Sequence, residues 1–253
     1  MSRICIIGDV HGMTDLLVLL VDRLALTQED TLVSLGDLVD KGPDPVGTVR
    51  YLGNLARDAS FQVVLVAANH EDRHLRYQRN RVERPAIAAA MAAMARELPK
   101  LDAELTEDDR AFLKQALPFW RAPNHDILCV HGGIPGNMAE LPPTPEAAAA
   151  LTGKRRRTLQ QILRTRYIDA KTGAFLSLGK EEPGDPFWAE VYDGRFGHVV
   201  FGHQPFFDGP GLFPHATGID TGAAHGGALT ALVIDVDGQR SFETVPASAG
   251  DKR

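Results

Sequence analysis

The first 70 residues of this 253-residue chain carry the feature that most constrains its fold, an alternation of strand and helix patterns. Short apolar runs rich in β-branched residues at 3–8, 30–35 and 61–67 predict three buried strands. Residues 14–26 and 45–56 carry apolar side chains at helical spacing and predict two helices between these strands. A β-α-β-α-β order is typical of an α/β fold with a parallel sheet.

After residue 70 the alternation of strands and helices gives way to a long helical stretch, and further strands follow it. Residues 74–120 form a long Ala- and Arg-rich stretch with a mostly helical pattern, which we interpret as a small helical cap insertion. Residues 142–163 predict two further helical pieces. Further strands are expected at 126–130, 197–201, 218–222, 228–235 and 241–245. We therefore expect one domain over residues 1–246 and a frayed tail at 247–253.

Composition excludes several classes of protein. The chain is 44% hydrophobic and 24% charged, as is usual for a globular domain, and its net charge of −6 argues against stable nucleic-acid binding or attachment to an anionic membrane. No apolar run is long enough to span a bilayer and no secretory signal is visible, so we expect a cytoplasmic protein. Cys5 and Cys129 lie in apolar runs and are expected to be buried thiols.

Clusters of polar residues follow five of the predicted strands, at the edge where α/β sheets bind ligands. Any one Gly-Asp pair or lone histidine is more often structural than functional. Five such clusters in one order favour a shared site whose carboxylate, imidazole and amide donors suit borderline divalent metals. The clusters are Gly8-Asp9-Val10-His11-Gly12, Gly36-Asp37-Leu38-Val39-Asp40, Asn69-His70-Glu71, His131-Gly132-Gly133 and Gly202-His203.

The segments GDVHG, GDLVDKGP, ANHE, HGG and GHQP resemble the five motifs of the calcineurin-like metallophosphoesterases. More narrowly they resemble the phosphoprotein phosphatases and their ApaH-like diadenosine tetraphosphatase relatives, over nearly the whole chain. The resemblance implies a four-layer α/β/β/α sandwich that holds two divalent metal ions and hydrolyses phosphate esters or anhydrides with a metal-activated water. The implied metal ligands are Asp9, His11, Asp37, Asn69, His131 and His203, with Asp37 bridging both metals.

The same resemblance assigns further roles. His70 corresponds to a general acid at the leaving-group oxygen, and Asp40 to its carboxylate partner. One departure from the motifs is Ala68, which stands where the family usually has glycine and would be strained if its φ were positive.

Cations that could bind phosphate follow from the motif positions. Lys41 stands where many relatives have arginine, and Arg166, with Arg164 as the alternative, is expected to form a second clamp. Arg73 and Arg76 are three residues apart, and one or both are expected to contact distal phosphates. The alternative is that they form salt bridges with Glu71, Asp72 and Glu83. The basic run at 154–157 is either a solvated face or a rim for an anionic substrate.

Several functions fit these residues. The leading prediction is hydrolysis of a nucleoside polyphosphate such as diadenosine tetraphosphate, or of another small phosphorylated substrate. The alternatives are a serine/threonine protein phosphatase, an RNA-end phosphatase and a non-catalytic protein that binds phosphorylated ligands. Manganese is the expected metal, with Fe, Zn, Co or Ni as alternatives. The sequence leaves the substrate and the oligomeric state open.

Overall fold

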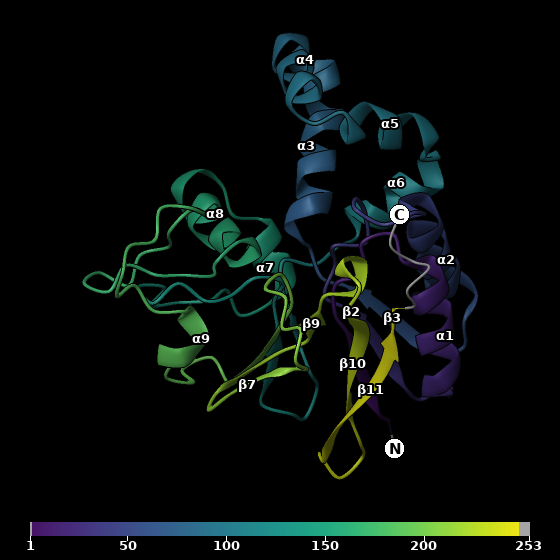
Figure 1. Cartoon of the computed structure of the whole chain (residues 1–253), viewed down its shortest axis with the longest axis vertical. Helices are drawn as coiled ribbons and strands as arrows, with labels where there is room; N and C mark the ends of the chain where they lie inside the picture. Colours follow the sequence, from purple (N-terminus) through teal and green to yellow (C-terminus); the bar gives the residue numbers. More distant parts are fainter. Residues whose placement is uncertain (1, 248–253) are drawn as a thin grey trace.

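The computed structural model describes residues 2–247 and has two β-sheets packed face to face (Figure 1). The first sheet has the order β11-β10-β1-β2-β3, with β9 paired to β10. Strands β1, β2 and β3 are parallel, as the initial rhythm predicts, and β10 runs antiparallel to β1. The bounds are β1 (Ile4–Ile7), β2 (Thr31–Ser34), β3 (Gln62–Leu65), β9 (Asp220–Thr221), β10 (Ala228–Ile234) and β11 (Arg240–Pro246).

The second sheet has the order β4-β5-β6-β8-β7, and its inner strands β5, β6 and β8 are parallel. Strands β7 and β8 were not expected as a pair, because both are only three residues long and too short for an alternating pattern to stand out. The bounds are β4 (Trp120–Arg121), β5 (Ile127–Cys129), β6 (His198–Phe201), β7 (Gly211–Phe213) and β8 (Ala216–Gly218).

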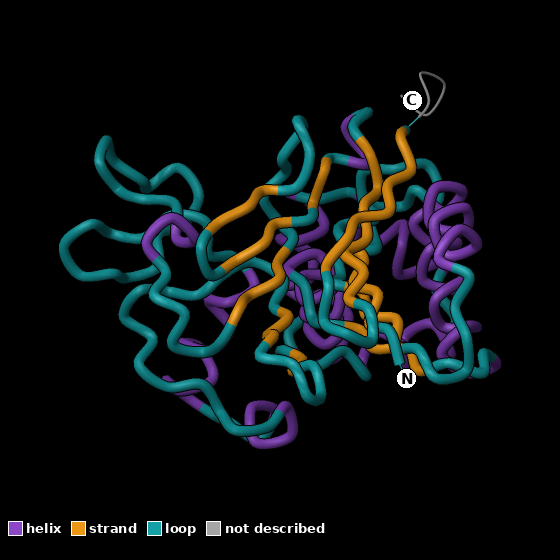
Figure 2. The backbone as a smooth tube through the Cα atoms, turned by 90° about the horizontal axis from the view of Figure 1, so that it is seen from below, coloured by secondary structure: helices purple, strands orange, loops and turns teal. Residues whose placement is uncertain are grey.

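Helices cover the outer face of the first sheet, and loops with short helices cover that of the second, which gives the predicted four layers (Figure 2). Helix α1 (Thr14–Leu24) and helix α2 (Pro45–Asp58) pack on the first sheet. Helix α2 begins where the sequence predicts, because Pro45 occupies its first turn and the Asp44 side chain accepts a hydrogen bond from the Gly47 N–H. The second sheet is covered by loops, α7 (Pro145–Ala149), α8 (Gly153–Leu159), the short helix η1 (Gln160–Leu163) and α9 (Trp188–Val191).

Three apolar clusters hold these layers together. One lies between the sheets and includes Ile6, Val33 and Val200, all fully buried. The others lie between each sheet and its covering helices and loops. Cys5 and Cys129 are buried free thiols within these clusters, as expected. The strand ends are therefore fixed by packing on both faces of each sheet, which gives the side chains that follow them defined positions.

The predicted cap region is helical throughout much of its length. It consists of α3 (Asn69–Glu83), α4 (Pro85–Met94), α5 (Glu97–Glu104) and α6 (Glu107–Lys114). Helix α3 begins at Asn69, directly after the third strand, so the helical segment starts inside the third polar cluster. Helices α3 and α4 project away from the sheets (Figure 1). Near the chain end, the Ala247 N–H donates to the Gly227 carbonyl, and the rest of the predicted frayed tail lies outside the described residues. A short helix, η2 (Ala223–His225), precedes β10.

Candidate metal centre and active-site cavity

The five polar clusters meet at the carboxyl ends of strands from both sheets. Asp9 and His11 follow β1, Asp37 follows β2, and Asn69 begins the helix that follows β3. From the second sheet, His131 follows β5 and His203 follows β6. The stacking of two sheets thus gathers side chains that are up to 194 positions apart in the sequence.

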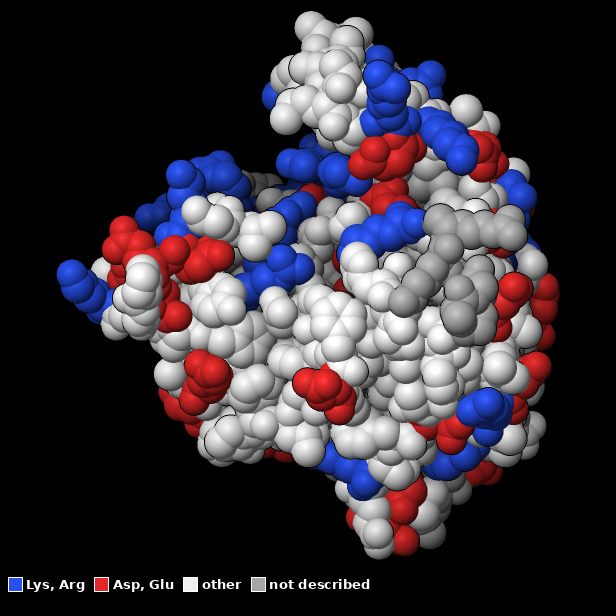
Figure 3. Space-filling model, in the orientation of Figure 1, with Lys and Arg blue, Asp and Glu red and all other residues white. Residues whose placement is uncertain are grey.

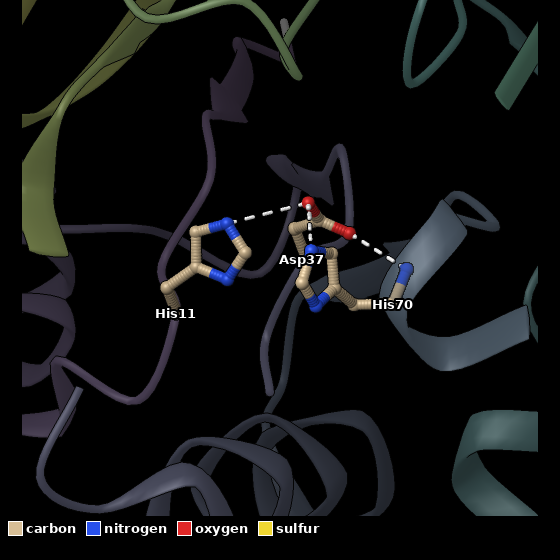
Figure 4. A group of neighbouring side chains, drawn as sticks. All are labelled: His11, Asp37 and His70. Carbon is tan, nitrogen blue, oxygen red and sulfur yellow. Dashed lines mark hydrogen bonds and ion pairs between the residues drawn. The ribbon is translucent and has the colours of Figure 1, made fainter. Parts of the chain in front are cut away.

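Two groups of potential metal ligands share Asp37. His11, Asp37 and His70 form one group, and Asp37, His131 and His203 form the other, with the ligand atoms of each group within 4.8 Å of one another. Asp37 Oδ2 lies 3.3 Å from His11 Nε2 and 3.4 Å from His131 Nε2. Figure 4 shows the Asp37 carboxylate between the His11 and His70 rings. A carboxylate shared by two groups of donors is what a bridging ligand between two cations requires.

Backbone carbonyls fix the tautomers of two of these histidines. His11 Nδ1 lies 2.8 Å from the Val39 carbonyl oxygen and His131 Nδ1 lies 2.9 Å from that of Leu35, so each Nδ1–H donates there. The Nε2 atoms are left to face the site, in the arrangement usual for metal-bound histidine.

His131 also supplies a test of whether a cation fits. Its Nε2 lies 2.9 Å from Asn69 Oδ1 and 3.4 Å from Asp37 Oδ2, so three atoms with lone pairs face one another. Only a proton on Nε2 or a metal cation between them makes this arrangement favourable. The donor set therefore fits a divalent metal.

Burial and neighbouring charges shift the pKa values of several groups at this site. Burial lowers the pKa of His131, but the carboxylates of Asp37 and Asp9 outweigh burial and raise it to about 9. Burial lowers the pKa of His11 to about 4, so its Nε2 carries no proton at neutral pH. Burial also lowers the pKa of His203 well below its usual value. Burial, with Asp220 next, raises the pKa of Asp9, which means that this carboxyl group lacks sufficient positive charge around it.

Asp9 and Asn69 lie beside these groups. Both oxygens of Asp9 accept the His203 backbone N–H, at 3.1 and 3.0 Å. Asp9 is 3% exposed, and a Cβ atom at Gly202 would lie 2.1 Å from its Oδ1, so only glycine leaves room for this carboxylate. The site thus brings together all six residues that the resemblance implies as ligands; their role as ligands stays a prediction.

The backbone is strained where the ligands lie. Of seven non-glycine residues with positive φ among residues 2–247, four belong to the polar clusters and a fifth, Lys41, directly follows one of them; the four are His11, Asp37, Asp40 and His203. Such backbone angles are unfavourable for residues other than glycine and are concentrated at functional sites. Ala68, by contrast, has φ −123°, so alanine at this position carries no strain.

Asp40 is the centre of a hydrogen-bond network around His70. Its Oδ2 lies 2.5 Å from His70 Nδ1, and its Oδ1 lies 2.8 Å from His74 Nε2. Burial opposes ionisation of Asp40, but its hydrogen bonds to His70 and His74 hold the pKa of this carboxyl group far below its usual value. The ionised Asp40 orients His70 so that Nε2 faces Asp37, at 3.9 Å. The contribution of His74 was not predicted, although its position four residues after His70 on α3 is a usable signal.

Glu71 belongs to the third polar cluster, but the sequence analysis gave it no role. It is 1% exposed, and its carboxylate accepts backbone N–H groups from Asp37, Leu38 and Val39 at 3.0, 2.7 and 3.3 Å. These bonds hold the loop that carries Asp37, whose φ is +48°. Glu71 therefore determines where the shared carboxylate lies.

An open cavity of about 340 Å³ adjoins the donor groups. Asp37, Asn69, His70 and His203 line one side of it, and three cations, Lys41, Arg164 and Arg166, also reach it. Lys41 Nζ lies 2.7 Å from His11 Nε2, Arg164 pairs with Asp72 at 2.8 Å, and Arg166 donates to the His203 carbonyl at 2.6 Å. The cavity therefore contains both arginines that the sequence offered as alternatives.

Arg73 and Arg76 do not line this cavity. Arg73 bonds to Asp40 at 2.9 Å and to Glu97 at 2.7 Å, and Arg76 lies 3.4 Å from Asp72. The Arg76–Asp72 contact is one of the salt bridges considered as the alternative for this pair, whereas the partners of Arg73 are not among the residues named there. Arg76 instead lines a separate groove with Lys114 and Arg156. Figure 3 shows Lys and Arg side chains gathered along the hollow between the α3–α4 arm and the part of the chain that carries α8.

Several other aromatic, acidic and basic residues lie outside this cavity. Trp188 and Tyr192 are buried in the core of the second sheet, so they cover the sheet and do not face the cavity. Asp220 is buried near Asp9, and its carboxylate accepts the Gly222 N–H at 2.9 Å, which fixes its orientation. The basic run at 154–157 lies on helix α8 and is exposed.

Comparison with known proteins identifies the class to which this site belongs. The sequence matches the calcineurin-like phosphoesterase family over residues 2–217, and the chain therefore belongs to that family. The members of this family use divalent metals, for which the His and Asp groups described above are suitable donors.

Individual relatives are similar over most of the chain. A protein of Bacillus velezensis named bis(5'-nucleosyl)-tetraphosphatase PrpE [asymmetrical] is 28% identical over 89% of this chain and 86% of its own length. A symmetrical bis(5'-nucleosyl)-tetraphosphatase of Pseudomonas fluorescens is 28% identical over 96% of this chain and 98% of its own. The crystal structure of a candidate diadenosine tetraphosphatase superimposes with a TM-score of 0.68 and 27% identity, covering 98% of this chain and 95% of the other. A yeast serine/threonine phosphatase shares the fold at a TM-score of 0.59 and 14% identity, covering 98% of this chain and 80% of the other. None of the helices among residues 2–247 has the length and apolar character needed to cross a membrane.

Proposed function

We propose that this chain hydrolyses dinucleoside polyphosphates, such as diadenosine tetraphosphate, with two divalent metal ions. The observation that carries the proposal is the Asp37 carboxylate, which lies 3.3 Å from His11 Nε2 and 3.4 Å from His131 Nε2 beside a cavity with three cationic side chains. The names of the relatives from Bacillus velezensis and Pseudomonas fluorescens support the substrate class. Asymmetrical and symmetrical enzymes are both among these relatives, so the position of cleavage is left to experiment.

The metal ions, for which Mn²⁺ is our first choice, would lower the pKa of a water molecule and withdraw charge from the phosphoryl oxygens. The residues proposed to hold them are Asp9, His11, Asp37, Asn69, His131 and His203. These nitrogen and oxygen donors suit Mn, Fe, Co, Ni or Zn, and none is a thiolate.

The chain's own residues have two further tasks in this proposal. His70 donates a proton to the oxygen that leaves phosphorus, since Asp40 binds Nδ1 and leaves Nε2 directed towards Asp37. Lys41, Arg164 and Arg166 bind the unesterified phosphate oxygens, whose charge grows as the bond to the leaving group breaks.

The alternative is a serine/threonine protein phosphatase, which is favoured by the Asp40–His70 pair because protein phosphatases of this family have an aspartate at that position. A hydrolysis assay with Mn²⁺ distinguishes the two by comparing diadenosine tetraphosphate with a phosphothreonine peptide, and the Asp37→Asn variant serves as the blank. We expect kcat/KM to be higher for the dinucleotide by at least about tenfold. A preference for the peptide would reject the proposed substrate class and leave the metal centre unaffected.

A further inference from the structure

The active-site cavity has a second wall whose chemistry differs from that of the metal side. Tyr167, Phe175, Leu176 and Leu178 line it, with Ser177 and Glu181 between and beyond them. These residues belong to the long loop between η1 and α9, a region in which the sequence analysis singled out only Arg164 and Arg166. The cavity is therefore lined both by cations close to the donor groups and by a set of aromatic and aliphatic side chains from this loop.

Internal hydrogen bonds hold this loop in a defined shape. The Asp169 carboxylate accepts the Lys171 N–H at 3.1 Å and the Thr172 N–H at 2.7 Å, and the Leu176 N–H donates to the Tyr167 carbonyl at 3.2 Å. Farther along, the Asp185 carboxylate accepts the backbone N–H groups of Ala170 and Glu182. A loop tied at both ends in this way presents its side chains as a preformed surface, which reduces the entropy lost when a ligand binds.

The aromatic and aliphatic side chains of the loop are left only partly covered by the protein. Tyr167 packs edge-on against the buried Phe187 at a centroid distance of 5.9 Å, so the core supports its ring while the residue still lines the cavity. Leu178 is 77% exposed although it lies at the rim of a charged site. A planar, weakly polar group bound there would cover both residues.

We propose that this wall, formed by Tyr167, Phe175, Leu176 and Leu178, binds the nucleoside next to the phosphate that is cleaved. This inference rests on the proposed function and specifies its substrate recognition. Any nucleobase can stack on aromatic side chains, because every base has a flat π face. A nucleoside bound to this wall would leave its phosphates close to Lys41, Arg164 and Arg166.

Glu181 supports a nucleoside in preference to another anionic group at this end of the cavity. Its carboxylate lines the same wall, where it repels a further phosphate or an acidic side chain. A nucleoside, in contrast, offers hydroxyl and amino hydrogens that a carboxylate accepts. The cavity thus combines cations that suit phosphate with an apolar surface and a hydrogen-bond acceptor that suit a nucleoside.

The test compares substrates with and without a nucleoside. Tyr167→Ala and Leu178→Ser are expected to raise the KM for diadenosine tetraphosphate about tenfold, or about 1.4 kcal/mol, within the range found for base stacking. Their kcat should stay within about threefold of that of the unchanged protein. The inhibition constant of inorganic tripolyphosphate should not change, because its contacts are with the cationic end. Tyr167→Phe keeps the ring and is expected to retain the original KM.

Leu212→Ser is the matched control, since Leu212 is 70% exposed on β7 and does not line the cavity. Leu178 is exposed, so Leu178→Ser keeps the test valid even if Tyr167→Ala disturbs the Phe187 contact. An unchanged KM in Leu178→Ser and Tyr167→Ala would overturn the inference, as would an equal loss of affinity for tripolyphosphate. If the unchanged protein hydrolyses the phosphothreonine peptide and not the dinucleotide, the proposed function fails, and the inference fails with it.

Discussion

Glu71 offers the sharpest test of how the fold positions the site, because its carboxylate holds the loop of Asp37 from the first turn of α3. In Glu71→Gln one acceptor oxygen remains for Leu38 and Val39, whose N–H groups both donate to Oε1. The new NH₂ group then faces the Asp37 N–H, which is 3.0 Å from Oε2. The glutamine NH₂ group and the Asp37 N–H are both donors, so the buried Asp37 N–H loses its acceptor.

An unsatisfied buried N–H costs about 1–3 kcal/mol, so Glu71→Gln should lower the free energy of unfolding by about that amount. The residue that loses its support is the proposed bridging ligand. We therefore also expect affinity for Mn²⁺ to fall about 10–100-fold, as is usual when a residue that supports a ligand is replaced. Urea unfolding of metal-free protein measures the first effect, and calorimetric titration with Mn²⁺ measures the second.

Glu83→Gln is the control on the same helix, since the Glu83 side chain is exposed and lies 3.9 Å from Arg79. It should change stability by no more than about 0.5 kcal/mol. If Glu71→Gln matched this control in both stability and Mn²⁺ affinity, the reasoning from its three hydrogen bonds would be refuted. A loss of stability with unchanged affinity would restrict Glu71 to a structural role.

Three further predictions concern other contacts. His70→Asn should retain bound metal but slow the hydrolysis of substrates with poor leaving groups by about 10²–10⁴-fold. Hydrolysis of activated aryl phosphates should slow much less, because their leaving groups do not need a proton. Equal losses on both kinds of substrate in steady-state kinetics would argue against an acid role. Gly202→Ala should displace Asp9, since a Cβ atom at position 202 would lie 2.1 Å from Asp9 Oδ1. Affinity for Mn²⁺, measured by calorimetric titration, should therefore fall. An unchanged affinity would contradict the argument that only glycine leaves room for the Asp9 carboxylate. Asp30→Asn should lose about 1–2 kcal/mol of stability at pH 7, because Asp30 is buried and bonded to Arg3, and its pKa is lowered from 3.8 to about 2. The contribution of the ionised Asp30 to stability is present above pH 3.8 and is lost as the pH falls through about 2. The difference in the free energy of unfolding between the original protein and Asp30→Asn, measured with urea, should therefore decrease to about zero over this range. A difference that stays constant with pH would show that the ionised carboxylate is not its cause.

Much of the fold was predictable because its signals are local. Each of the first three strands is a short apolar run followed by a glycine-containing or polar cluster, and the helices between them have an apolar face. The clusters identified the candidate ligands for the same reason, since residues at adjacent strand ends must lie close together.

The residues that sequence reasoning missed act through contacts between distant segments. Glu71 reads as an ordinary acidic residue in the first turn of α3, and its partners lie 32 to 34 positions earlier. Arg73 was expected to bind phosphate but pairs with Glu97 across the insertion, 24 positions away. Tyr167 was not predicted to line the cavity, because aromatic residues in a sequence do not reveal which of them the core will bury.

The metal content of the purified chain tests the central claim most directly. Equilibrium with Mn²⁺, followed by removal of free ion and elemental mass spectrometry, should give about two metal ions per chain. Asp37→Asn should lose metal from both positions and lose turnover, because each group of donors depends on the same carboxylate. A single metal per chain, or an Asp37→Asn variant that retains both ions and near-normal activity, would contradict the shared-ligand centre.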